Sequence, residues 1–300
     1  MDKIITYDSI ASFNNEFGIE TPHPLIYIEE MEKTKPVTME EKYIFNFYHI
    51  YLIDANCGSI KYGKNYYDYQ DGTLLFLSPG QVVSVENQPT DLSKGWVLMF
   101  HPDLLHGTQL GRNMKKYTFF SYNTNEALHL SEQERAVVIN CFRNIKMELG
   151  HIMDNNSKDL IVSNIELFLN YGKRFYERQF ITQIHSTGGD ILSHFENILN
   201  DYFQSGQPSE NGIPTVKYCA DQMHLSVNYL SDLLRKETGK GAMEHIHLKL
   251  MEIAKERLFD KSKSISEIAY ELGFEYPQHF SRIFKNKVGV SPNEYRNAIK

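Results

Sequence analysis

Four polar side chains near the end of the sequence have the types and spacing needed to read nucleic-acid bases. Gln278, Ser281, Arg282 and Lys285 recur at intervals of three and one residues and then three, so a helix would place them on one face. Arginine pairs well with guanine and glutamine with adenine, because each can form two hydrogen bonds in the major groove. This face is expected to bind its partner by hydrogen bonds and charge neutralisation, without a covalent reaction.

Two short helices joined by a tight turn are predicted to position these side chains. Ser264 and Glu267 have the spacing of a capping box, so the first helix should begin near Ile265. Gly273 suits the end of that helix, and Pro277 suits the first turn of the next one. The residues expected on the two buried faces are Ile265, Ile268, Ala269, Leu272, Phe280, Ile283 and Phe284. This is the helix-turn-helix arrangement.

The same stretch resembles the signature of a known family. The runs I-x-x-I-A-x-x-x-G-F, F-S-R-x-F-K and G-x-S-P-x-x-Y-R lie within Ile265–Arg296. They resemble the AraC/XylS family of bacterial transcription regulators. The resemblance implies sequence-specific binding of double-stranded DNA, a regulator or activator rather than an enzyme, and a first helix-turn-helix unit upstream. On spacing alone, a three-helix packing module with a solvated polar face is the alternative.

An internal repeat predicts where the first unit lies. From Ala220 the matching positions are 10, 13, 14 and 19 residues on, and from Ala269 they are 11, 14, 15 and 20 residues on. The repeat predicts units at about 213–240 and 262–296, joined by a linker helix over Met243–Asp260. Such a helix spans about 25 Å. That is the scale needed to hold two recognition helices about 34 Å apart, one turn of DNA.

The first recognition helix is expected over Ser226–Thr238. Across both units, the candidate DNA contacts are Asn228, Ser231, Asp232, Arg235, Gln278, His279, Ser281, Arg282 and Lys285. Many family members have arginine where this chain has Asp232. An aspartate is repelled by phosphates, but it can accept a hydrogen bond from a cytosine amino group. The linker helix has Leu250 where the family often has arginine, so no backbone contact is expected there.

The charge is divided unevenly between the two ends of the chain. Its 300 residues suit two domains, and the formal net charge is −7. Residues 208–300 contain 14 Lys and Arg against 12 Asp and Glu, a net of +2, so residues 1–207 carry −9. The acidic N-terminal part is therefore expected to avoid nucleic acid.

The sequence also bears on cellular location. No apolar run approaches the roughly 18 residues of a membrane span. The first residues, MDKIITYDSIASFNNEF, lack the apolar core of a signal peptide, so a cytoplasmic protein is expected. Cys57, Cys141 and Cys219 are odd in number and scattered, which is typical of free buried thiols.

Residues 21–125 have the pattern of a β-barrel. The predicted strands are Tyr43–Tyr51, Asn56–Tyr62, Tyr66–Tyr69, Thr73–Leu77, Gln81–Val85 and Trp96–Phe100. Many short strands favour a barrel or jelly roll. The stretch GTLLFLSPGQ is similar to the cupin-like barrel that family members carry at this place. Residues 1–20 are expected to form a loosely structured arm.

The predicted barrel is rich in aromatic residues, with ten of them between Tyr43 and Phe76. A small barrel can enclose one ligand. The candidate ligand-binding residues are Tyr48, Tyr66, Tyr67 and Trp96. The alternative is that these aromatic residues only pack the core. The metal-binding cupin motif, a His-x-His pair followed by Glu and a later His, is absent, so neither a metal nor a cofactor is expected.

Two amphipathic helices are predicted to follow the barrel, over about residues 131–180. A capping box at Ser131 and Glu134 begins the first helix. The pair resembles the dimerisation element of the family, and packing on the barrel alone is the alternative. Gln183–Gly189 is the predicted linker, Asp190–Phe203 a further helix, and Ser205–Asn211 an exposed loop.

The fold class that follows is α+β, with two domains. A sensor and dimerisation domain is expected at 1–184 and a tandem helix-turn-helix DNA-binding domain at 185–300. The resemblance implies a small-molecule effector, a homodimer and RNA polymerase as partners. Two other hypotheses remain: a cupin-type isomerase or dioxygenase with a helical appendage, and a scaffold whose C-terminal part binds protein.

Overall fold

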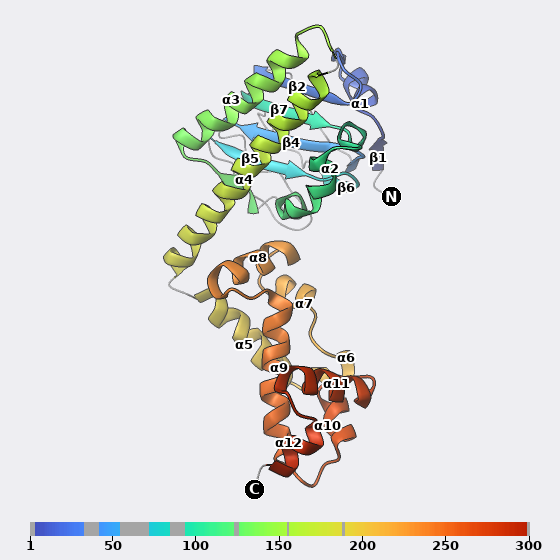
Figure 1. Cartoon of the computed structure of the whole chain (residues 1–300), viewed down its shortest axis with the longest axis vertical. Helices are drawn as coiled ribbons and strands as arrows, with labels where there is room; N and C mark the ends of the chain where they lie inside the picture. Colours follow the sequence, from blue (N-terminus) through green and yellow to red (C-terminus); the bar gives the residue numbers. More distant parts are fainter. Residues whose placement is uncertain are drawn as a thin grey trace. The chain divides into compact units, whose positions relative to one another are not determined.

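The computed structural model describes residues 4–32, 42–54, 72–84, 94–122, 126–154, 156–187 and 190–298. The chain divides into two compact units, Met1–Gln179 and Phe180–Lys300 (Figure 1). The described strands all belong to the first unit, and the described part of the second unit is helical. The predicted α+β class is therefore confirmed.

The described strands of the first unit form two sheets. Their bounds are β1 Ile4–Tyr7, β2 Ile26–Glu32, β3 Lys42–Phe45, β4 Tyr48–Ile53, β5 Thr73–Leu77, β6 Gln81–Ser84, β7 Lys94–Phe100 and β8 Leu128–His129. One sheet has the order β2-β7-β4-β5-β8 and is antiparallel throughout. The other has the order β1-β3-β6, in which β1 and β3 are parallel. The β-rich unit was predicted, but its described strands form two sheets and not one closed barrel.

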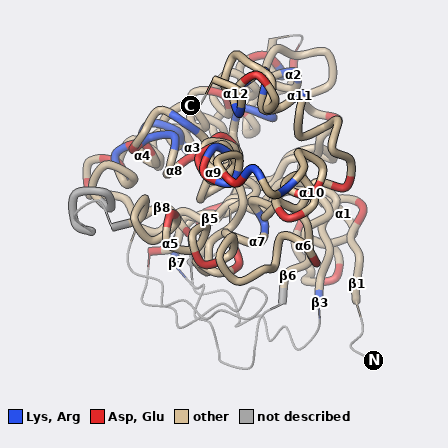
Figure 2. Tube along the Cα trace, turned by 90° about the horizontal axis from the view of Figure 1, so that it is seen from below, with Lys and Arg blue, Asp and Glu red and all other residues tan. Residues whose placement is uncertain are grey.

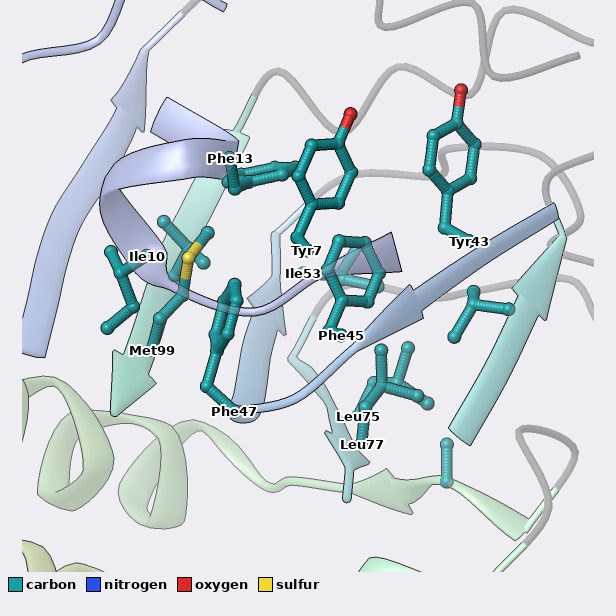
Figure 3. Close-up of a cluster of buried hydrophobic side chains, with 13 residues drawn as sticks. Tyr7, Ile10, Phe13, Tyr43, Phe45, Phe47, Ile53, Leu75, Leu77 and Met99 are labelled. Atoms are coloured by element: carbon teal, nitrogen blue, oxygen red, sulfur yellow. The ribbon is translucent and has the colours of Figure 1, made fainter. Parts of the chain in front are cut away.

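The two sheets share a hydrophobic core (Figure 3). The three-stranded sheet contributes Tyr43 and Phe45, and the five-stranded sheet contributes Ile53, Leu75 and Met99. Phe47 is fully buried in the same core and lies between β3 and β4. The single strand predicted over Tyr43–Tyr51 was therefore wrong, because the chain passes at this point from one sheet to the other.

The described part of the N-terminal arm carries a strand and a helix, so the predicted loose structure was wrong there. Strand β1 pairs with β3, and helix α1 (Ile10–Glu16) begins at a capping box formed by Ser9 and Ser12. Ile10 and Phe13 of α1 are buried in the core between the sheets. A four-residue strand and a two-turn helix are too short to give a clear periodic pattern, which is why the sequence did not indicate them.

Two long helices cover the other face of the five-stranded sheet (Figure 1). They are α3 (Glu132–Leu149), which begins at the predicted capping box of Ser131, and α4 (Ser157–Thr187). The ring of Trp96 in β7 lies 6.1 Å from that of Phe142 in α3. The described short helices between β7 and β8 are η1 Pro102–Leu105, α2 Gln109–Asn113, η2 Met114–Lys116 and η3 Thr118–Ser121.

Helix α4 runs further than the sequence indicated. Residues 183–187, which were predicted to begin the linker, belong to its last turns. The prediction relied on Gly188 and Gly189, but no glycine or proline lies between Gly172 and Gly188 to end the helix earlier. The predicted domain boundary at 184/185 consequently falls within α4.

The second unit contains the last turns of α4 and eight further described helices. Their bounds are α5 Asp190–Gln204, α6 Gln207–Asn211, α7 Val216–Gln222, α8 Val227–Thr238, α9 Ala242–Leu258, α10 Ile265–Glu271, α11 Pro277–Val288 and α12 Pro292–Ala298. The predicted helix at 190–203 is present as α5. The predicted loop at 205–211 is in part the short helix α6, whose Pro208 is buried.

Two further findings concern the chain as a whole. No helix in the described ranges is both long enough and apolar enough to cross a membrane. Cys141 and Cys219 are buried free thiols, and burial raises the pKa of Cys219 to about 11. Cys57 lies outside the described residues.

Candidate nucleic-acid interface

The second helix-turn-helix is built by the local signals that the sequence carries. The Ser264 hydroxyl accepts from the Glu267 amide at 3.1 Å, and the Glu267 carboxylate accepts from the Ser264 amide at 2.6 Å. The hydrogen bond from the Ser264 amide, with a further one from the Ser264 side chain, holds the pKa of the Glu267 carboxylate below its usual value. Gly273 ends α10 with φ +90, and a Cβ there would lie 2.5 Å from the carbonyl carbon of Gly212. The turn into α11 therefore requires glycine for both its backbone conformation and its close packing.

The first helix-turn-helix has the same turn. The Leu225 amide donates to the Ala220 carbonyl at 2.9 Å, as the Phe274 amide donates to the Ala269 carbonyl at 3.0 Å. His224 occupies the left-handed position with φ 56, where the second helix-turn-helix has Gly273. In both turns the closing hydrogen bond therefore comes from the amide five residues after the repeated alanine. The extra residue of the second helix-turn-helix lies between this amide and the recognition helix residues that follow. The internal repeat read from the sequence is present in the fold.

Helix α9 joins the two helix-turn-helix units and packs against helices of both. Its 17 residues correspond to about 26 Å of rise. A stripe of fully buried residues runs along it: Ile246, Leu250, Ala254 and Leu258. Leu250 is a core residue, so it makes no backbone contact with DNA in this arrangement. The Arg296 Nε of α12 donates to the Leu258 carbonyl at 3.2 Å, so this arginine caps α9.

Helix α11 presents the predicted contact residues on its outer face. Gln278, His279, Arg282 and Lys285 are exposed, and Ser281 is half-buried. The helix is held from behind by Phe280 and Phe284, which are fully buried in the core of the second unit. The apolar and polar faces of α11 therefore lie where the helical period predicted them.

Helix α8 presents its predicted contact residues less openly. Asn228, Ser231 and Asp232 are half-buried, and only Arg235 of this group is exposed. Arg235 Nη1 donates to Asp232 Oδ1 at 2.8 Å, so the two charges are paired within the helix. Both helices end at glycines in the left-handed conformation, Gly239 and Gly289. The two reading helices thus share a backbone design but differ in side-chain accessibility.

Two exposed residues near these faces were not among the predicted contacts. The Tyr276 side chain is 46% exposed at the N-cap of α11, and its ring lies 5.5 Å from that of His279. Val227 is 40% exposed at the first position of α8. An apolar side chain at this place is suited to contact a thymine methyl group. The signal for both was an apolar residue directly before or at the start of a recognition helix, outside the buried stripe.

The four predicted ligand-binding residues are not brought together in one described site. Tyr66 and Tyr67 lie outside the described residues. The Tyr48 ring stacks on Phe100 at 4.8 Å, and Trp96 is 2% exposed. By strand register, both lie on the sheet face that α3 and α4 cover, opposite to the core between the sheets. Among the described residues, no three His, Cys, Asp or Glu side chains are grouped to hold a metal ion.

The fold and the exposed faces of α8 and α11 define a tandem helix-turn-helix module. A family model described as a helix-turn-helix domain matches residues 219–298 of this chain. The predicted AraC-type helix-turn-helix domain is therefore confirmed for the C-terminal part of the chain.

Three similar proteins illustrate the extent of the match. The uncharacterized HTH-type transcriptional regulator YfiF of Bacillus subtilis is 30% identical over 149 residues, 50% of this chain and 44% of that protein. The lactose operon transcription activator of Staphylococcus xylosus is 22% identical over 249 residues, 83% of each chain. A crystal structure of an AraC-type transcriptional regulator from Chromobacterium violaceum covers 37% of this chain and 94% of its own, at 20% identity and a TM-score of 0.31. The chain spans less than half the length of several curated relatives that it matches.

Proposed function

We propose that this chain is a sequence-specific transcription regulator whose helices α8 and α11 read successive major-groove segments of one DNA duplex. The observation that carries the proposal is the outer face of α11, where Gln278, Arg282 and Lys285 are exposed above a buried Phe280 and Phe284. Arg282 and Gln278 supply base readout, and Lys285 supplies a phosphate contact. Because the two units are joined within one chain, the target is asymmetric.

The first unit supplies control and assembly in this proposal. Exposed leucines on α4, Leu160 at 49% and Leu167 at 46%, are one heptad apart, with Ile181 at 43% two heptads further on. An apolar stripe at this spacing favours helix pairing between two copies of the chain. A small molecule that binds the first unit would shift the regulator only if it bound the active and inactive arrangements with different affinity. RNA polymerase is the partner through which such a regulator would act.

The direction of regulation is taken from one relative. The Staphylococcus xylosus protein, which aligns over 83% of both chains, is named as a transcription activator. This supports activation as the direction for the present chain. The competing hypothesis of a cupin-type enzyme is tested by metal analysis of the purified protein. A stoichiometric, tightly bound iron, manganese or nickel ion would favour the enzyme.

The proposed function is tested by selecting genomic fragments with the purified full-length protein at moderate salt and sequencing the bound DNA. Enrichment of a few upstream regions that share a two-part motif is expected. Folded protein that binds no DNA would contradict the proposal. Binding without enrichment would contradict sequence-specific reading by the protein alone and would require a repeat with small-molecule extracts.

A further inference from the structure

The two recognition helices differ sharply in charge. Helix α11 carries Arg282, Lys285 and Lys287 and no acidic residue, a net of +3 (Figure 2). Helix α8 carries Asp232 and Glu237 against Arg235 and Lys236, a net of zero. Phosphate neutralisation supplies most of the sequence-independent affinity for DNA. If both helices enter DNA, non-specific sequences would therefore be held mainly through α11, and α8 would add little to this binding.

Within α8, the ion pair between Asp232 and Arg235 neutralises the charge on the face that would meet DNA. Asp232 and Arg235 lie one turn apart, and their side chains are 18% and 59% exposed. The Arg235 guanidinium also lies close to Gly241, since a Cβ on that glycine would be 3.1 Å from Nη2. The arginine that would otherwise contact a phosphate is thus held against its own helix and the start of α9.

This pair can open at small cost. The Arg235 side chain is exposed, and solvent that reaches a charge screens it and leaves the ion pair little net stabilisation. Near DNA, the Asp232 carboxylate is repelled by phosphates, but a base amino group can donate a hydrogen bond to it. A cytosine N4 amino group is the donor that suits a carboxylate in the major groove.

We propose that Asp232 is a specificity-determining residue that prevents α8 from contributing to the binding of non-specific DNA. On non-specific sequences, Asp232 keeps its ion pair with Arg235, and its carboxylate repels the DNA phosphates. At a matching half-site, Asp232 accepts a hydrogen bond from a cytosine amino group, and Arg235 turns to a phosphate. The inference rests on the proposed function, because it requires α8 to enter the major groove. The inference predicts that Asp232 lowers the affinity for non-specific DNA and so increases the discrimination between matching and non-matching sites.

The test compares two duplexes in binding assays with the full-length protein. One duplex is the sequence that wild-type protein enriches most from a random library, and the other is a scrambled duplex of the same composition. Asp232→Ala should bind the scrambled duplex several-fold more tightly and the enriched duplex about tenfold more weakly. Its salt dependence on the scrambled duplex should steepen by about one phosphate contact, because Arg235 is released. Asp232→Asn should move the preference at one position from cytosine towards adenine.

The matched control is Glu237→Gln. It removes the same charge from the same helix, but Glu237 is five positions from Asp232 and lies on another side of the helix, with one carboxylate oxygen buried. The inference is overturned if Glu237→Gln changes the two affinities as Asp232→Ala does, since net charge would then suffice. It is also overturned if Asp232→Ala leaves their ratio unchanged. If wild-type protein enriches no sequence either alone or with small-molecule extracts, the proposed function itself fails. If wild-type protein does enrich a sequence and Arg282→Ala abolishes the enrichment but Asp232→Ala does not alter it, the inference alone fails.

Discussion

Arg282 is the residue from which the reading of bases by α11 can be tested most directly. It is exposed on the second recognition helix, between the buried Phe280 and Phe284. Arg282→Ala should weaken binding to the preferred site by about 1–3 kcal/mol and relax the base preference at one position. Lys287→Ala, which removes an exposed charge from the same helix, is the control and should weaken all sequences alike. Equal weakening by Arg282→Ala on every sequence would show a phosphate contact instead.

His49 gives the first unit a built-in sensitivity to acid. Its side chain is fully buried, and neither ring nitrogen has a hydrogen-bond partner in the described part of the chain. The rings of Phe45 and Phe47 lie 4.3 Å and 4.7 Å from it. Burial lowers the pKa of His49 to about 3. Between pH 6.5 and 3 the unfolded chain binds a proton that the folded chain does not, so stability is lost as the pH falls through this range.

The expected size of this effect is about 1.4 kcal/mol per pH unit, or roughly 2 kcal/mol between pH 6.5 and 5. His49→Phe should remove that part of the pH dependence, whatever its effect on stability at neutral pH. Urea unfolding followed by the fluorescence of Trp96, the single tryptophan and a residue of β7, measures the first unit specifically. His151→Phe, at an exposed position, is the control. An unchanged pH slope in His49→Phe would contradict this account.

At the scale of elements, the turn between α10 and α11 is the least tolerant part of the proposed interface. Gly273→Ala combines a left-handed backbone with a Cβ placed 2.5 Å from a backbone atom of Gly212. We expect it to destabilise the second unit by several kcal/mol, beyond the roughly 1–2 kcal/mol of the left-handed conformation alone. Gly239→Ala is the matched control, because φ is +77 but nothing lies within 4 Å. Hydrogen exchange of α10 and α11 compares the two; equal losses would show that the close approach has no effect.

The elements that could be predicted are those with local signals. Capping boxes at Ser131 and Ser264, Gly273 and Pro277 each act within one turn of chain, and the helices they bound are present. The break between β3 and β4 could not be predicted, because it depends on which sheet each strand joins. For the interface, helical period predicted the face of α11, but the role of Arg296 depends on how close α12 comes to the end of α9.

For the whole molecule, the prediction concerns assembly. If α4 pairs two copies of the chain, the double substitution Leu160→Lys and Leu167→Lys should convert a dimer to a monomer, because four lysines would face one another. Sedimentation of the full-length protein at several concentrations measures this. Glu177→Lys, which adds a lysine at another exposed position of α4, should leave the dimer intact. A wild-type protein that stays monomeric at high concentration would refute the assembly.

The parallel pairing of β1 with β3 also sets an order of folding. Residues 4–7 must wait for residues 42–45, and the third strand of that sheet begins only at Gln81. Contacts between residues distant in sequence form slowly, because a long loop must close first. The helices of the second unit pack largely on near neighbours in the chain, so they should reach their final arrangement sooner once synthesised. The β-rich first unit would then be the slow-folding part of the chain, and aggregation during expression should be traced to it.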